Sequence, residues 1–211
     1  MAKSLEQQLI STKILPVVTP YSVESTVEVA KALKAGGISA VEITLRTPAA
    51  LEAIVAVKEA NIDGMLVGVG TAVSAADITK VADIGVDFVV SPGMTKNIMD
   101  AAQETGVKML PGVSGPSDIL FGLEYGLDLF KLFPAGVLGG QKMLKALNGP
   151  FPNLKFCPTG GVGPDNIRDY LAFPNVICVG GSWMLPSDLV LNNQWDKITE
   201  LSNEATTLIA S

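Results

Sequence analysis

Short apolar runs alternate with longer amphipathic segments along the chain. Eight of these runs have the length and the apolar or β-branched content of buried strands. The predicted strands are Ile14–Val18, Ala40–Leu45, Met65–Val69, Phe88–Ser91, Lys108–Leu110, Leu129–Phe133, Phe156–Thr159 and Ile177–Val179. The segments between them repeat apolar residues at helical spacing, and they lie at Thr26–Ala35, Ala49–Glu59, Ala75–Ile84, Asn97–Glu104, Ile119–Tyr125, Lys142–Leu147 and Ile167–Phe173. A further helix is predicted near each end, at Ser4–Ser11 and at Asn193–Ile209.

Strands that each precede a helix are the pattern of a (β/α)8 TIM barrel, here with an N-terminal helix. The 211 residues contain no linker or low-complexity stretch, so residues 1–211 are interpreted as one α/β domain. The alternative is an open doubly wound sheet, which usually has a glycine-rich loop after its first strand, where this chain reads VVTPYS. Barrel active sites lie at the C-terminal ends of the strands, so the polar residues there are candidates for chemistry.

Composition and charge argue against several classes of function. The net charge of −6 disfavours nucleic-acid binding, because neutralising phosphates requires a basic face. No apolar stretch has the length of a signal peptide or of a membrane span, so a cytoplasmic protein with no membrane partner is expected. The chain has no histidine, which removes Ser-His-Asp catalysis and histidine-ligated metals. Cys157 and Cys178 are predicted to be buried small hydrophobic residues.

The second predicted strand carries polar residues at alternate positions. Glu42, Thr44 and Arg46 share one face of this strand. With the apolar face toward the helices, the polar face points into the barrel lumen, where charges are costly unless they are paired or used. An ion pair between Glu42 and Arg46 that only satisfies itself is the structural alternative. Arg46 is one of two arginines, and a guanidinium at a strand end suits bidentate binding of a substrate carboxylate.

A lysine lies late in the sixth predicted strand, with apolar neighbours on both sides. Lys131 is in phase with Leu129 and Phe133. Burial disfavours the ammonium and favours the free amine, which is the form that attacks a carbonyl. A structural pair of Lys131 with Glu42 is the alternative, and it is compatible with catalysis, since a nucleophile and a proton-transfer carboxylate need to be close.

Glycines follow the third, seventh and eighth predicted strands. Those after the last two match the phosphate-binding turns of barrels, where backbone N–H groups hold the anion; the residues concerned are Gly160, Gly161, Gly181 and Ser182. No dinucleotide fingerprint or nucleotide phosphate loop is present. The structural alternative is that these glycines only make tight turns.

A 2-oxo acid with a distal phosphate fits these groups from end to end. We expect Arg46 and Thr71 to bind its carboxylate, and Lys131 to form an imine with the neighbouring ketone. Retro-aldol cleavage then leaves an enamine of pyruvate, with Glu42 moving protons. No metal and no cofactor are expected.

The motifs VEITLRT, GVGT, SPG, PG, FKLFPA, CPTGGV and GGSW occur in this order from about Ile14 to Trp183. In order and spacing they resemble the 2-keto-3-deoxy-6-phosphogluconate (KDPG) aldolase family, whose bifunctional members also cleave 4-hydroxy-2-oxoglutarate (KHG). The resemblance implies a metal-independent, homotrimeric Schiff-base aldolase of the Entner–Doudoroff pathway. It implies Lys131 as the Schiff-base lysine, Glu42 as the proton-transfer group, and a substrate-binding set of Arg46, Thr71, Pro92, Phe133, Thr159, Gly160, Gly161, Gly181 and Ser182.

The chain departs from the family pattern at three glycines. Gly136 follows FPA, where the family often has a glutamate, and Gly115 and Gly163 replace hydroxyl residues. These changes lie beside the hydroxyl- and phosphate-binding part of the site, so an aldolase for a related 2-keto-3-deoxy sugar acid is an alternative. The galactonate-type branch usually carries an asparagine in place of Arg46, so this arginine favours the gluconate-type substrate.

Three other functions would use the same fold. A phosphate-binding isomerase or epimerase would need paired carboxylates or a histidine facing its substrate. A metal-dependent pyruvate aldolase would need a Glu/Asp pair at two strand ends, which the pattern does not provide. A non-catalytic sugar-phosphate-binding barrel would require neither Lys131 nor Glu42.

Overall fold

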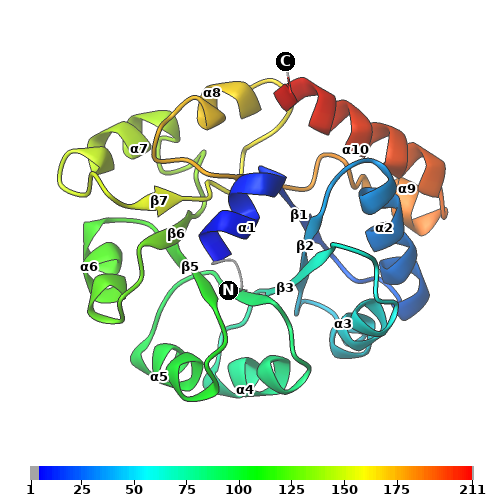
Figure 1. The fold of residues 1–211 in the computed structure, drawn as a ribbon, viewed down its shortest axis with the longest axis horizontal. Coiled ribbons are helices and arrows are strands. Elements are labelled where there is room, and N and C mark those ends of the chain that lie inside the picture. Colours follow the sequence, from blue (N-terminus) through cyan, green and yellow to red (C-terminus); the bar gives the residue numbers. More distant parts are fainter. Residues whose placement is uncertain (1–4, 211) are drawn as a thin grey trace.

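The computed structural model describes residues 5–210, in which strands and helices alternate around a ring (Figure 1). Within these residues an eight-stranded parallel sheet has the order β7-β6-β5-β4-β3-β2-β1-β8. Its strands are β1 (Ile14–Val18), β2 (Ala40–Thr44), β3 (Leu66–Gly70), β4 (Phe88–Ser91), β5 (Met109–Val113), β6 (Leu129–Leu132), β7 (Lys155–Phe156) and β8 (Val179–Gly181). Isolated parallel bridges, Phe156 to Val176 and Thr159 to Gly180, join the two ends of this order.

Helices surround the strands, apart from α1 (Leu5–Thr12), which lies across the centre of the ring (Figure 1). The outer helices are α2 (Val23–Ala35), α3 (Ala50–Glu59), α4 (Ala75–Asp83), α5 (Lys96–Thr105), α6 (Pro116–Glu124), α7 (Gln141–Asn148), α8 (Ile167–Leu171), α9 (Ser187–Leu191) and α10 (Trp195–Ala210). This arrangement confirms the predicted TIM barrel with an N-terminal helix. Ser4, the predicted start of that helix, lies outside the described residues.

Several element boundaries differ from the predicted ones for local reasons. Helix α2 begins at Val23 rather than Thr26, because Ser22 and Ser25 form a capping box that satisfies its first N–H groups. Strand β2 ends at Thr44, which leaves Arg46 in the following turn. The short helix α9 was not predicted, since five residues are too few to display helical periodicity.

Side chains form two apolar layers, one inside the strands and one between strands and helices. Leu15, Phe88, Leu110, Leu129 and Ile177 belong to the inner cluster. Strand β2 shows the alternation directly, since Val41 and Ile43 pack in the outer layer while Ala40 packs inside. The polar face of β2 therefore points into the lumen, as predicted.

The inner layer is crowded, and glycines provide the space for its larger side chains. A Cβ atom added at Gly68 would overlap the Phe88 ring, and one added at Gly180 would overlap the Thr159 side chain. Close packing of this kind fixes side-chain positions, because little volume remains for other rotamers.

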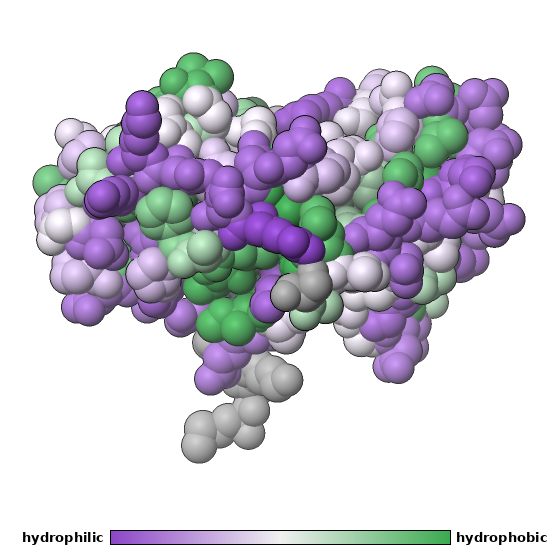
Figure 2. All heavy atoms as spheres, turned by 90° about the horizontal axis from the view of Figure 1, so that it is seen from above, coloured by the Kyte–Doolittle hydropathy of each residue, from purple (hydrophilic) through white to green (hydrophobic). Residues whose placement is uncertain are grey.

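Polar residues cover most of the face shown in Figure 2, and apolar residues gather near its middle. Within residues 5–210 no helix is both long and apolar enough to cross a membrane.

Candidate active site

Lys131 and Glu42 meet inside the barrel, from strands β6 and β2. The Lys131 ammonium donates to both carboxylate oxygens of Glu42, with Nζ 2.9 Å from Oε1 and 3.0 Å from Oε2. Their side chains are only 7% and 1% exposed. The buried partner of Glu42 is therefore Lys131, and the alternative ion pair of Glu42 with Arg46 is not formed. A proton can pass directly between the two groups, which would leave a free amine beside a carboxylic acid.

Glu42 has room for its carboxyl group because the neighbouring strand carries a glycine. Gly70 lies opposite Thr44 in the β2–β3 ladder, and a Cβ atom added there would overlap the Glu42 carboxyl. Gly70, the last residue of β3, therefore keeps free the space that the carboxylate occupies.

Gly70→Ala is expected to displace Glu42, lower kcat, and reduce the free energy of unfolding by about 1–3 kcal/mol, as overpacking does. Denaturant unfolding and steady-state kinetics measure the two effects. Gly149→Ala is a matched control, because a Cβ atom there would make only an ordinary contact. Unchanged stability and unchanged kcat in Gly70→Ala would contradict this account of the packing.

Arg46 lies just beyond β2, exposed at the mouth of the barrel, rather than in the lumen proper. Its Nε atom donates to Thr71 Oγ1 at 3.0 Å, and neither terminal amino group bonds to another described residue. Thr71 has a φ of 63°, a left-handed conformation that costs a non-glycine residue about 1–3 kcal/mol. Together, the two residues present a guanidinium with two free terminal amino groups to the mouth.

Two threonines that flank Arg46 anchor its segment to the end of β1. Thr44 Oγ1 donates to the Val18 carbonyl at 2.9 Å, and Thr47 Oγ1 donates to the Pro20 carbonyl at 2.6 Å. Thr47 was not predicted to support the site. Its only signal is the position directly after Arg46, and a threonine in a loop has many other uses.

The turn after β7 presents unused backbone donors at the same mouth. Gly160 and Gly161 have φ values of 91° and 79°, and their N–H groups donate to no described residue. The Gly160 carbonyl accepts from the Gly136 N–H at 2.9 Å, which ties the turn to the loop after β6. Positive φ at both positions requires glycine, and the free N–H groups suit an anion.

The other predicted substrate-binding residues lie around this mouth. The Phe133 ring centroid is 5.5 Å from Lys131 Nζ, and Thr159 is buried beyond β7, where it forms the isolated bridge to Gly180. Pro92 and Ser182 are exposed after β4 and β8, and Gly181 is packed so closely against Trp183 that a Cβ atom there would overlap the indole. Strand ends thus bring the predicted set to one end of the barrel.

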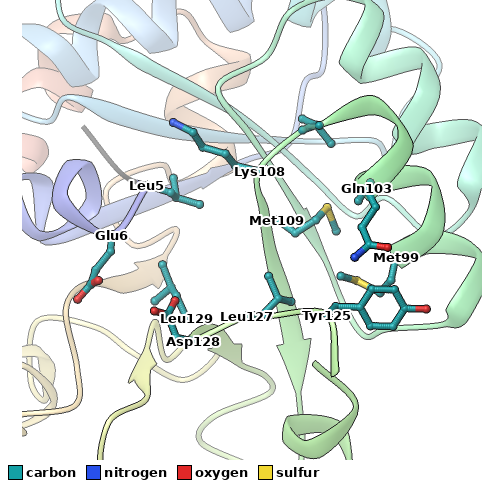
Figure 3. Close-up of a pocket in the computed structure, with 14 residues that line it drawn as sticks. Leu5, Glu6, Met99, Gln103, Lys108, Met109, Tyr125, Leu127, Asp128 and Leu129 are labelled. Carbon is teal, nitrogen blue, oxygen red and sulfur yellow. The ribbon is translucent and has the colours of Figure 1, made fainter. Parts of the chain in front are cut away.

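A cavity lies at the opposite end of the barrel (Figure 3). It has a volume of about 460 Å³, and Leu5, Met109 and Leu129 line it together with Met99 and Tyr125. Met109 and Leu129 are the first residues of β5 and β6, so this cavity faces the strand starts. This cavity is therefore separate from the site around Lys131, which lies toward the C-terminal ends of the strands.

Both cysteines are free and buried inside the barrel, as predicted. A hydrogen bond with Cys157, together with burial, raises the pKa of the Cys178 thiol well above its usual range. Within residues 5–210, no group of three or more Cys, Asp or Glu side chains is placed to hold a metal ion.

The matched relatives and solved structures align with nearly the whole of this chain. "KHG/KDPG aldolase" of Escherichia coli K12 is 42% identical, over 96% of this chain and 94% of its own. KDPG aldolase from Legionella pneumophila, solved with pyruvate captured at low pH as a covalent carbinolamine intermediate, is 39% identical with a TM-score of 0.92, over 96% and 98%. KDPG aldolase of Zymomonas mobilis ZM4, solved with 3-phosphoglycerate, is 38% identical with a TM-score of 0.89, over 98% and 97%.

The family model described as "KDPG and KHG aldolase" matches residues 5–201. This match, together with the identity of the relatives, is consistent with an aldolase site built around the lysine–carboxylate pair inside the barrel. The chain belongs to the KDPG and KHG aldolase family.

Proposed function

We propose that this protein is a Schiff-base aldolase that cleaves KDPG to pyruvate and glyceraldehyde 3-phosphate, and also KHG to pyruvate and glyoxylate. The observation that carries the proposal is the buried, bidentate contact between Lys131 and Glu42. A sugar-phosphate-binding barrel without catalysis has no use for such a pair, since burying two charges is costly.

Lys131 and Glu42 carry the covalent steps. A proton moves from Lys131 to Glu42, and the free amine adds to the C2 ketone to give a carbinolamine, which loses water to form an iminium. A base removes the proton of the C4 hydroxyl, and the C3–C4 bond breaks. Its electrons move to the iminium and leave an enamine. Protonation at C3 and hydrolysis release pyruvate, with Glu42 exchanging these protons directly or through water.

The two ends of the substrate bind at different strand ends. Arg46 donates both terminal amino groups to the C1 carboxylate, with Thr71 holding its Nε atom. The N–H groups of Gly160 and Gly161, with Gly181 and Ser182, receive the phosphate. The 3-phosphoglycerate in the Zymomonas mobilis structure supports a phosphorylated ligand for the family. Pro92, Phe133 and Thr159 form the wall around the reacting carbons.

The assembly and location of the protein are inferred from the family resemblance. We propose a homotrimer, and the breakdown of sugar acids fits a cytoplasmic enzyme. Sedimentation velocity measures the first of these, and a monomer at micromolar concentration would contradict it.

Sodium borohydride with pyruvate is expected to trap an irreversible adduct on Lys131. Reduction of the imine adds a stable substituent to one lysine, and peptide mass mapping identifies it. The same reaction without pyruvate is the control. An adduct on another lysine, or none, would refute the proposed mechanism.

Ser182→Ala is expected to lower kcat/KM for KDPG about tenfold and to change kcat/KM for KHG much less. Only the first substrate carries a phosphate, and a lost hydrogen bond to a charged group has about this effect. Parallel steady-state assays measure both substrates. Equal losses on both would show that Ser182 does not contact the phosphate.

A further inference from the structure

A second opening lies next to Ser182 and continues away from the barrel axis. It has a volume of about 330 Å³ and lies between the ends of β1 and β8 and the helices α2 and α9. Val29 and Val190, on those two helices, form part of its apolar lining. Its polar lining consists of hydroxyl groups, from Thr19, Tyr21, Ser182 and Ser187.

This cavity begins at the proposed phosphate-binding end of the site. In the β1–β8 ladder Pro16 lies opposite Gly181, which places Val17 beside Ser182, and both residues line the cavity. Val17 is in phase with Leu15, which packs inside the barrel, so Val17 also faces the lumen. A ligand that leaves the lumen past Ser182 therefore enters this space.

The hydroxyls of the cavity are uncommitted, whereas those next to it in the sequence are in use. None of the side chains of Thr19, Tyr21, Ser182 and Ser187 forms a hydrogen bond within residues 5–210. By contrast, the neighbouring Ser22 hydroxyl caps α2. Thr19 is half-buried and the other three residues are exposed, so their hydroxyls are free to turn toward a ligand that is rich in acceptors.

The cavity also lacks charged side chains, since no Lys, Arg, Asp or Glu lines it. An anionic group there is held by neutral donors, with no carboxylate to repel it. Tyr21 contributes the largest of these donor side chains, and it is 44% exposed, so its phenol can reorient toward a ligand.

From these observations we infer that the phosphate, held on one side by Gly160, Gly161 and Ser182, borders this cavity on its other side, and that the Tyr21 hydroxyl donates a hydrogen bond to it. This inference rests on the proposed function and adds a specificity-determining residue. KDPG is one carbon and one phosphoryl group longer than KHG beyond the bond that breaks. Tyr21 therefore contacts the first substrate and not the second.

Tyr21→Phe keeps the ring and removes only the hydroxyl, so it isolates this contact. We expect kcat/KM for KDPG to fall about ten- to a hundredfold, the range of a hydrogen bond to a charged group, while kcat/KM for KHG stays unchanged. Tyr125→Phe is the matched control, because Tyr125 lines the cavity at the opposite end of the barrel and bonds to Asp100. It should leave both substrates unaffected.

A binding measurement separates this inference from the proposed chemistry. Glycerol 3-phosphate is a probe of the phosphate end that needs no catalysis, and calorimetric titration should show about tenfold or greater weakening in Tyr21→Phe. Unchanged binding of the probe, or equal kinetic losses on KDPG and KHG, would overturn the role of Tyr21. Failure of the borohydride trap in the unsubstituted protein would refute the aldolase mechanism, and the titration would still report on Tyr21.

Discussion

Lys131→Met is expected to abolish aldol cleavage, with a loss in kcat of roughly 10⁴- to 10⁶-fold, the range seen when a covalent nucleophile is removed. Methionine has nearly the length of lysine but no amine, so no imine forms. Coupled detection of pyruvate measures the rate, and the borohydride adduct should disappear with it. Lys145→Met, at an exposed position on α7, should keep full activity.

A loss of folding must be separated from a loss of chemistry in this variant. Removing Lys131 leaves Glu42 buried without its partner, which destabilises by about 3–5 kcal/mol unless the carboxyl is protonated. The double variant Lys131→Met, Glu42→Gln removes both charges and should recover part of that stability while remaining inactive. If the double variant regained cleavage, Lys131 would not be the nucleophile.

Glu42→Gln is expected to lower kcat by about 10²- to 10⁴-fold, the usual contribution of a positioned acid or base. Glutamine nearly matches the shape of the side chain but cannot accept a proton. The substitution leaves the Lys131 side chain in place, so pyruvate trapping by borohydride should persist. The two substitutions therefore differ in one readout: the adduct survives in Glu42→Gln and is lost in Lys131→Met.

Exchange of the C3 protons of pyruvate with deuterium reports on the same step without any cleavage. This exchange passes through the enamine, so NMR should show it slowed in Glu42→Gln about as much as cleavage is. Glu28→Gln, at an exposed pair with Lys31 on α2, is the control. Exchange at the unsubstituted rate in Glu42→Gln would assign proton transfer to another group.

Strand periodicity predicted the parts of the site that lie within strands. Alternation placed Glu42 in the lumen, and an unusual position late in a strand identified Lys131; the structure brings them into contact. Arg46 was expected in the same lumen, but β2 ends two residues earlier and the turn carries it to the mouth. The alternation of side chains along a strand predicts which way a side chain points only as far as the strand extends.

Loop residues were the ones that the pattern could not place. Thr47 is held by the Pro20 carbonyl, and Tyr21 lines a cavity that is formed by residues distant in the sequence. Neither contact leaves a local signal in the sequence. The same holds for Gly70, whose Cβ would overlap a side chain from the adjacent strand. Such constraints come from tertiary packing, which a single sequence does not display.

The separation of Lys131 and Glu42 along the chain has a consequence for how activity appears during folding. They are 89 residues apart, so their contact forms only after the intervening strands β3 to β5 have paired. Closing such a long loop is slow and entropically costly, and a partly assembled barrel leaves both groups in water. Recovery of the imine-forming lysine during refolding is therefore expected to report the pairing of strands β2 to β6, not the formation of the first strands.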